Sequence, residues 1–264
     1  MRILLTCDTH GKLDVINELA AATGAEQCFH MGDFCTYTKE SVKRFSTDLL
    51  YKQLQHVPQL QSERLAVLDR NDTETMRLLV LKYRTYGNFD EYFSGKKKFS
   101  IPVGAVCGNN DDAEVWAQLG SRRLENLEIL NEEQLLGMED FLICGIGGGI
   151  AESTPVSGIG CISTEAQITK LENWLESLQN NSEIIGRKRI LLTHIPPYEN
   201  ERLMLFLKRC KPVLCLCGHT HHWDDRTVGE CRIITLPRPD RGYAVLELNK
   251  GHWNCQLYKN EVII

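Results

Sequence analysis

Five short apolar segments of this chain each run into an aspartate, a histidine or an asparagine, and this repetition constrains the fold more than any other feature. In open α/β sheets, ligands bind at the carboxyl ends of the strands. The pattern therefore predicts an α/β fold in which these polar side chains meet at one edge. The segments 3–6, 27–31, 104–107, 190–193 and 213–217 lead into Asp8-Thr9-His10, Gly32-Asp33, Gly108-Asn109-Asn110-Asp111, His194 and Gly218-His219-Thr220-His221-His222.

The composition narrows the class of protein. With 264 residues, 42% of them hydrophobic, the chain is long enough to bury a core without covalent cross-links. No apolar run approaches the roughly eighteen residues that a bilayer span requires, so no membrane partner is expected. A net charge of -5 gives no strong sign of nucleic-acid binding, although a small anionic substrate remains compatible with it.

The cysteines indicate the compartment. Eleven are scattered along the chain, an odd number with no Cys-x-x-Cys pair. This pattern predicts reduced, buried thiols rather than a disulfide framework or a thiolate zinc site. The first apolar run meets Asp8 too early to be a signal-peptide core. We therefore expect a cytoplasmic protein.

The periodicity of apolar residues predicts one domain, residues 1–264, with an insertion. Residues 2–7 and 27–31 have the pattern of strands on either side of a helix over 13–22. The stretch between Asp33 and Asn109 is too long for a simple connection, and its apolar spacing predicts a helical insertion over roughly 38–98. Three short strands are expected within 127–146, a helix over 163–178, and strands over 232–235, 243–248 and 255–258.

Seven of the polar side chains at the strand ends form a plausible ligand set for metal ions. They supply two carboxylates, one amide oxygen and four imidazoles, which suits manganese, iron, zinc, cobalt or nickel better than magnesium. Seven ligands exceed what one such ion takes but suit two ions that share a carboxylate. Any one Asp or Asn alone could instead be a turn residue. The seven are Asp8, His10, Asp33, Asn109, His194, His219 and His221.

These five motifs, in this order, resemble those of the calcineurin-like metallophosphoesterase superfamily, and they extend from residue 8 to residue 221. The resemblance implies the metallo-dependent phosphatase fold, a four-layered α-β-β-α sandwich of two mixed sheets with the metals above the strand ends. It also implies a dinuclear centre whose bridging hydroxide attacks phosphorus. Asp8, His10, Asp33 and His221 would hold the first ion, and Asp33, Asn109, His194 and His219 the second.

The chain departs from the phosphoprotein phosphatases of that superfamily at two positions. They continue the second motif as Asp-Arg-Gly, whereas Phe34 follows Asp33 here. They also place a histidine after Gly-Asn as the proton donor, where this chain has Asn110 and then Asp111. The sequence is thus closer to the phosphodiesterase-type branch with Gly-Asn-x-Asp. The general acid is open between Asp111 and His222, which join Asp33, Asn109 and His194 as candidate catalytic residues.

The resulting functional hypothesis is a dinuclear metal-dependent phosphoesterase, with a phosphodiesterase favoured over a protein phosphatase. Its substrate would be a small phosphate ester, with a nucleotide as one candidate, and the oligomeric state is left open. One alternative is a nuclease or a cyclic-nucleotide phosphodiesterase. Another is a non-catalytic scaffold of the same fold that binds a protein partner through the insertion.

Two further groups of polar residues have an ordinary structural interpretation. His30 lies inside a strand pattern and is expected to be a core histidine or to support the ligands from behind. Arg238, Asp240 and Arg241 lie on a late proline-containing loop, where a solvated turn is at least as well supported as a phosphate contact.

Overall fold

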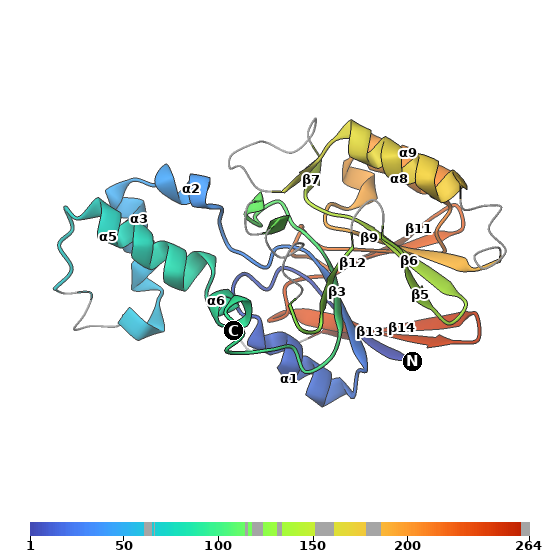
Figure 1. Ribbon diagram of the computed structural model, residues 1–264, viewed down its shortest axis with the longest axis horizontal. Helices are drawn as coiled ribbons and strands as arrows, with labels where there is room; N and C mark the ends of the chain where they lie inside the picture. Colours follow the sequence, from blue (N-terminus) through green and yellow to red (C-terminus); the bar gives the residue numbers. More distant parts are fainter. Residues whose placement is uncertain are drawn as a thin grey trace.

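Two six-stranded mixed sheets packed face to face form the centre of the molecule (Figure 1). The computed structural model describes residues 1–60, 65, 67–113, 116–117, 124–130, 134–150, 161–177 and 186–259. Each sheet has four neighbouring parallel strands and two antiparallel strands, so both are mixed as the resemblance implies.

The first sheet contains the strands that precede three of the five motifs. Its parallel part is β1 (Arg2–Thr6), β2 (Gln27–Met31), β3 (Val103–Val106) and β4 (Leu127–Ile129). An antiparallel pair, β13 (Gly242–Asn249) and β14 (His252–Lys259), extends it beside β1.

The second sheet contains the strands that precede the other two motifs. Its parallel part is β6 (Phe141–Ile146), β9 (Lys188–Thr193), β10 (Leu214–Cys217) and β12 (Cys231–Thr235). Antiparallel edge strands β5 (Leu136–Met138) and β11 (Asp224–Val228) close its two sides. A short parallel pair, β7 (Gly149–Ile150) and β8 (Ile162–Ser163), lies outside both sheets in the hydrogen-bond pattern.

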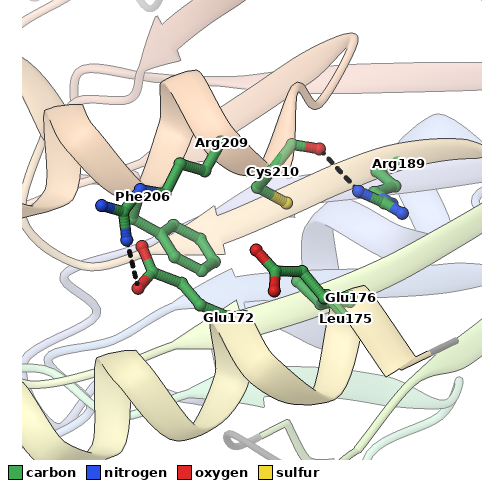
Figure 2. Close-up of a pocket in the computed structure, with 7 residues that line it drawn as sticks. All are labelled: Glu172, Leu175, Glu176, Arg189, Phe206, Arg209 and Cys210. Atoms are coloured by element: carbon green, nitrogen blue, oxygen red, sulfur yellow. Dashed lines mark hydrogen bonds and ion pairs between the residues drawn. The ribbon is translucent and has the colours of Figure 1, made fainter. Parts of the chain in front are cut away.

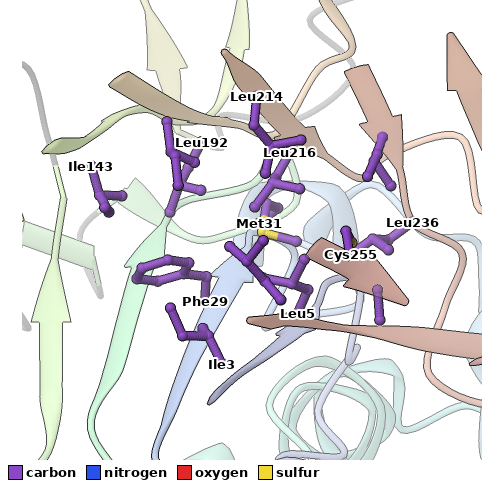
Figure 3. Close-up of a cluster of buried hydrophobic side chains, with 14 of the residues drawn as sticks. Ile3, Leu5, Phe29, Met31, Ile143, Leu192, Leu214, Leu216, Leu236 and Cys255 are labelled. Carbon is purple, nitrogen blue, oxygen red and sulfur yellow. The ribbon is translucent and has the colours of Figure 1, made fainter. Parts of the chain in front are cut away.

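The main core fills the space between the two sheets (Figure 3). Alternate residues of a strand point to opposite faces, so every second apolar residue of these strands enters this layer. Leu5 and Phe29 from the first sheet meet Leu192 and Leu216 from the second, and all four are fully buried. Complete burial of a side chain of this size contributes roughly 1.5–3 kcal/mol. The facing sheets thereby fix the relative positions of the loops at their ends.

Helices cover the outer face of each sheet and complete four layers. Helices α1 (Asp14–Thr23) and α6 (Phe89–Phe93) pack on the first sheet, and α8 (Glu165–Ser177) and α9 (Glu201–Cys210) on the second (Figure 1). The expected α-β-β-α sandwich is therefore confirmed. On α8, the buried residues Ile168, Leu171 and Leu175 follow the predicted helical spacing, while Leu178 lies outside the described residues.

Charged side chains join the two outer helices α8 and α9. Glu172 on α8 accepts hydrogen bonds from Arg202 and Arg209 on α9, at 2.7 and 3.2 Å. Beside this pair, Arg189 donates to the carbonyl oxygen of Cys210 at 2.9 Å (Figure 2). These side chains line a small hollow that includes none of the seven predicted metal ligands, so it is structural rather than part of the site.

The stretch predicted as a helical insertion is helical. It comprises α2 (Lys39–Lys43), α3 (Thr47–Gln55), η1 (Pro58–Leu60), α5 (Thr73–Val80) and the π-helical turn η2 (Leu81–Thr85), with α6 completing it; residues 61–64 and 66 lie outside the described part. Helices α2, α3 and α5 extend away from the sandwich in Figure 1, whereas α6 lies against it. Buried residues such as Leu50, Leu54 and Met76 form a separate cluster.

Three parts of the fold are additional to the sequence-based expectations: the pair β7 and β8, strand β11, and helix α9 with the turn before it. Strand β11 is mostly exposed and charged, and it pairs only with β12. Helix α9 starts at Asn200, whose side chain accepts a hydrogen bond from the Leu203 amide at 2.9 Å. A short 3-10 turn, η4 (Pro197–Glu199), precedes it.

Over the described ranges, none of the helices combines the length and apolarity needed to cross a bilayer.

Candidate metal centre

The five motifs lie at the carboxyl ends of β1, β2, β3, β9 and β10. The first three strands are parallel neighbours in one sheet, and the last two are parallel neighbours in the other. Because the sheets face each other, the loops after these strands meet at one edge of the sandwich. The structure brings all seven predicted ligands together there, in two groups.

The first group, here called the outer cluster, consists of Asp8, His10 and His221. His10 Nε2 and His221 Nε2 lie 3.3 Å apart, and His221 Nε2 lies 3.2 Å from Asp8 Oδ1. One ligand atom from each residue lies within 4.8 Å of the other two. The side chain of His221 is 37% exposed, so this cluster is open to solvent on one side.

The second group, the deep cluster, consists of Asp33, Asn109, His194 and His219. Asn109 Oδ1 lies 2.8 Å from His194 Nε2 and 3.0 Å from His219 Nδ1. His194 Nε2 is also 3.5 Å from Asp33 Oδ1, and neither of these side chains is more than 2% exposed. Asp33 and His194 are thus shielded from water, whereas Asn109 and His219 are partly exposed.

The two clusters share one pocket. Ligand atoms of Asp8, Asp33 and His194 lie within 4.8 Å of one another, which places a residue of the outer cluster beside two of the deep cluster. The seven side chains, collected from five loops, therefore surround a single space.

Left-handed backbone conformations are concentrated at the site. Nine non-glycine residues in the described part of the chain have positive φ, and five of them belong to the two clusters. Such a conformation costs of order 1–3 kcal/mol per residue and persists only where the surrounding structure enforces it. The five are Asp8 (51°), His10 (46°), Asp33 (58°), His219 (70°) and His221 (58°).

Two motif glycines are explained by close approach to the carboxylates. A Cβ on Gly108 would lie 2.0 Å from Asp33 Oδ1, and a Cβ on Gly218 would lie 2.7 Å from Asp8 Oδ2. Both distances are too short for any side chain. Glycine before Asn109 and before His219 therefore lets each carboxylate pack directly against the loop that provides its neighbouring ligands.

The orientation of two histidine rings is fixed by backbone carbonyls. His10 Nδ1 lies 2.9 Å from the carbonyl oxygen of Cys35, and His194 Nδ1 lies 2.8 Å from that of Met31. A carbonyl only accepts, so each Nδ1 carries the proton and Nε2 presents its lone pair to the pocket. Metal-binding histidines usually have this arrangement, in which the second nitrogen donates to a carbonyl or carboxylate.

An unsatisfied buried oxygen also fits a cation. Within the described part of the chain, Asp8 Oδ1 is buried and makes no well-aligned hydrogen bond, although it lies 3.2 Å from His221 Nε2; Oδ2 accepts one from the His219 amide at 3.1 Å. Leaving a buried acceptor without a partner costs about 1–3 kcal/mol. The nitrogen and oxygen donors around it suit a divalent transition ion. The residues present therefore fit the metal ions that the superfamily resemblance implies.

Electrostatic coupling within the pocket appears in the pKa values. Burial alone would raise the pKa of Asp8, but contacts with His221 and His194 lower it below its ordinary value. Burial would lower the pKa of His194, yet Asp33 and Asp8 raise it above the ordinary value. Both shifts indicate that Asp8 and the neighbouring histidines stabilise each other's charged forms.

Asp111, one of the two candidate general acids, lies behind the site. Its carboxylate accepts hydrogen bonds from the backbone amides of Asp33, Cys35 and Gly108, at 3.1, 2.9 and 2.7 Å, and it is 1% exposed. Burial and the nearby Asp33 raise its pKa. The geometry gives Asp111 a role in holding the second and third motifs together.

The neighbouring Asn110 contacts the site directly. Its backbone amide donates to Asp33 Oδ1 at 2.9 Å and its side-chain amide to Asp33 Oδ2 at 2.7 Å. The position that holds a histidine in the protein phosphatases is therefore occupied by a side chain that orients Asp33. Sequence reasoning noted Asn110 only as a departure, because its contact with Asp33 joins two distant motifs.

The remaining candidates lie outside the two clusters. His222, the other candidate general acid, is exposed next to His221. His30 is fully buried, stacks on Phe34 at 3.8 Å and has its pKa lowered to about 3 by burial, so it is a core histidine as expected. Arg238 pairs with Asp240 at 3.2 Å.

Comparison with known proteins gives the same class as the fold and the site. A two-sheet sandwich with aspartates and histidines gathered at the strand ends defines a metallophosphoesterase. The model of the calcineurin-like phosphoesterase family matches residues 1–223, and the chain belongs to that family. It is accordingly a metal-dependent phosphoester hydrolase. No curated protein matches its sequence.

Solved structures show the same fold at low sequence identity. One is 13% identical, with a TM-score of 0.64, over 98% of this chain and 99% of its own. GAP50, the anchor in the inner membrane complex of Plasmodium, is 13% identical with a TM-score of 0.54, over 99% of this chain and 85% of its own. A putative 5'-nucleotidase from Staphylococcus aureus is 12% identical with a TM-score of 0.52, over 98% of this chain and 53% of its own.

Proposed function

We propose that this protein is a phosphodiesterase that binds two divalent transition-metal ions, manganese being the first to test. The observation that carries the proposal is the division of the seven side chains into two clusters that share one pocket. The outer cluster, with Asp33, would hold one ion. The deep cluster would hold the other, which makes Asp33 the shared carboxylate.

In this proposal, the bound ions and the protein side chains contribute different parts of the chemistry. When bound, two such ions lower the pKa of a water molecule and offset the charge that develops on the phosphoryl oxygens. The protein lowers the pKa of Asp8 and keeps the His10 and His194 rings turned so that Nε2 faces the pocket. Asn110 fixes both oxygens of Asp33.

The preference for a diester rests on the Gly-Asn-x-Asp motif at Gly108–Asp111, and the site offers few proton donors to a leaving group. Asn110 is bonded to Asp33, and both oxygens of Asp111 accept backbone hydrogen bonds. His222, which is exposed beside His221, is then our candidate for the general acid. A leaving group that is already good, such as an aryl oxide or a nucleoside, needs little protonation.

The experiment compares a diester and a monoester on metal-loaded protein. With manganese added, bis(p-nitrophenyl) phosphate should be hydrolysed faster than p-nitrophenyl phosphate, and Asp33→Ala should reduce the rate by about a thousandfold or more. Elemental analysis should find about two ions per chain. The exposed His252 on β14 offers a control, because His252→Ala should change neither value. Full activity in Asp33→Ala would refute the site, and a faster monoester reaction would refute the diesterase.

The insertion, roughly residues 38–98 within a domain of 1–264, stays a proposal for the domain organisation. Its separate buried cluster supports this division. The scaffold alternative would require a protein that binds no manganese, which the same elemental analysis tests.

A further inference from the structure

The end of the insertion contacts the loop that carries His10. This segment, residues 85–88, follows the π-helical turn η2 and leads into α6. The amide of Asn88 donates to the carbonyl oxygen of Gly11 at 2.9 Å, and the amide of Thr36 donates to that of Thr85 at 3.1 Å. Two loops next to predicted metal ligands are thus hydrogen-bonded to the insertion.

Asn88 also caps helix α1 from outside that helix. Leu13, at the start of α1, provides no side-chain cap. Instead, its backbone amide donates to Asn88 Oδ1 at 2.8 Å, although the two residues are 75 positions apart. An uncapped amide at a helix start needs such an acceptor. Asn88 therefore binds the chain on both sides of Lys12, directly after His10.

The contact leaves no space between the two backbones. A Cβ on Gly87 would lie 2.2 Å from the carbonyl oxygen of Gly11, and Gly87 itself has a φ of 55°. Gly11, in turn, has a φ of 80° and follows His10, whose φ is 46°. Glycine adopts this conformation freely, but His10 requires enforcement by its surroundings, and the insertion is packed directly against the residue that follows it.

We propose that Asn88 is a positioning residue for the outer cluster: it holds the His10 loop in the left-handed conformation in which Nε2 faces the pocket. The inference rests on the proposed function, because it takes His10 to be a metal ligand. Thr36 supports the same loop from the other side, since its hydroxyl donates to the carbonyl oxygen of His10 at 3.1 Å. The insertion is then part of the support of the metal centre.

The test measures manganese binding to metal-stripped Asn88→Ala by titration calorimetry. Loss of the loop's support should weaken one of two binding steps by about tenfold, the lower end of the effect of removing a group that orients a ligand. The other step should stay unchanged, because the deep cluster makes no contact with Asn88. Asn88→Asp keeps the acceptor for Leu13 but replaces the amide that bonds Asp14, so it should recover affinity only in part.

Asn17 on α1 provides a matched control. It joins the same helix to the last part of the insertion, through Tyr92 and Lys98, and to Ser100 just beyond it, and no hydrogen bond of its side chain reaches the His10 loop. Asn17→Ala should lower the melting temperature of the metal-free protein and leave manganese affinity unchanged. If Asn17→Ala weakens binding as much as Asn88→Ala, or if Asn88→Ala binds manganese normally, the inference is overturned.

Two further variants separate this inference from the proposed function. If His10→Ala binds manganese normally, the site assignment itself fails. If His10→Ala weakens binding and Asn88→Ala does not, only the positioning role fails. Should Asn88→Ala not fold, Thr36→Val and Thr36→Ser apply the same test, because only serine keeps the hydroxyl bonded to His10. Equal affinity in these two would contradict the proposal.

Discussion

The outer and deep clusters of the candidate metal centre are built from the same residue types but supported differently. In the deep cluster, the side chains of Asp33 and His194 are at most 2% exposed and lie 3.5 Å apart, and Asn109 Oδ1 lies 2.8 Å from His194. In the outer cluster, His221 is 37% exposed, and the loop of His10 is held by the insertion. The deep cluster depends on the packing of two sheets, whereas the outer one depends on loops.

This difference means that two ions bound by similar ligands need not be bound equally. Water cannot readily take the place of a buried ligand such as His194, whereas it can replace the partly exposed His221. We therefore expect the deep cluster to hold its ion more firmly. Each of the following predictions would sharpen or break this comparison.

The largest effect is expected for His194→Ala in the deep cluster. The rate of diester hydrolysis should fall about a thousandfold, and excess manganese should not restore it, because no water reaches the vacated position. Stability should also fall by about 2 kcal/mol, since the Met31 carbonyl loses its donor. Steady-state kinetics over a manganese series and urea unfolding check both parts. Recovery at millimolar manganese would remove the distinction between the clusters.

A smaller effect is expected for His221→Ala in the outer cluster. Activity should fall by about a hundredfold at low manganese and recover in part as manganese is raised. The reason is that solvent can take the place of a ligand that is already partly exposed. His222→Ala serves as the neighbouring comparison, since it should leave the manganese dependence unchanged. If added manganese restored none of the activity, His221 would behave like the ligands of the deep cluster, which would contradict the comparison.

Chelation should separate the two ions in time. When metal-loaded protein is mixed with EDTA, one ion per chain should leave early and the second later, because the outer cluster is open to solvent. Metal analysis of desalted samples at successive times gives the two phases. Simultaneous loss of both ions would show that the clusters behave as a unit.

The smallest effect is on thermal stability. An ion at a hundred times its dissociation constant stabilises the folded state by about 2.7 kcal/mol, so loading the wild type should raise its melting temperature by at least about 5 °C. His221→Ala should retain part of this manganese-induced increase in melting temperature, and His194→Ala should retain a smaller part. Differential scanning calorimetry with and without manganese provides the measurement. Equal gains in the two variants would contradict the comparison.

Most of the site could be predicted from the sequence because its signals are local. Each ligand directly follows an apolar strand, as His194 follows 190–193, and the order of the motifs carries the family resemblance. The structure confirms the four-layered fold and brings the seven side chains together, while their roles as ligands stay a prediction. What makes the motifs recognisable is physical: Gly108 and Gly218 precede ligands because no other residue fits against the carboxylates.

The remaining features depend on contacts between distant parts of the chain. Strand β11 is charged and exposed, so only its pairing with β12 makes it a strand. The hydrogen bond from Leu13 to Asn88 spans 75 positions and leaves no local pattern. Helix α9 is different, because its cap at Asn200 and its apolar spacing through Leu203, Phe206 and Leu207 were present in the sequence.

The unequal burial of the thiols has a practical consequence. Ten of the eleven cysteines are buried, and burial raises the pKa of those such as Cys28, which makes them slow to react. Cys107 is the exception: it is partly exposed and lies two positions before Asn109. A thiol-reactive fluorophore should label native protein first at this position. The chain thus carries a natural attachment point from which an optical signal could follow occupancy of the pocket without an engineered cysteine.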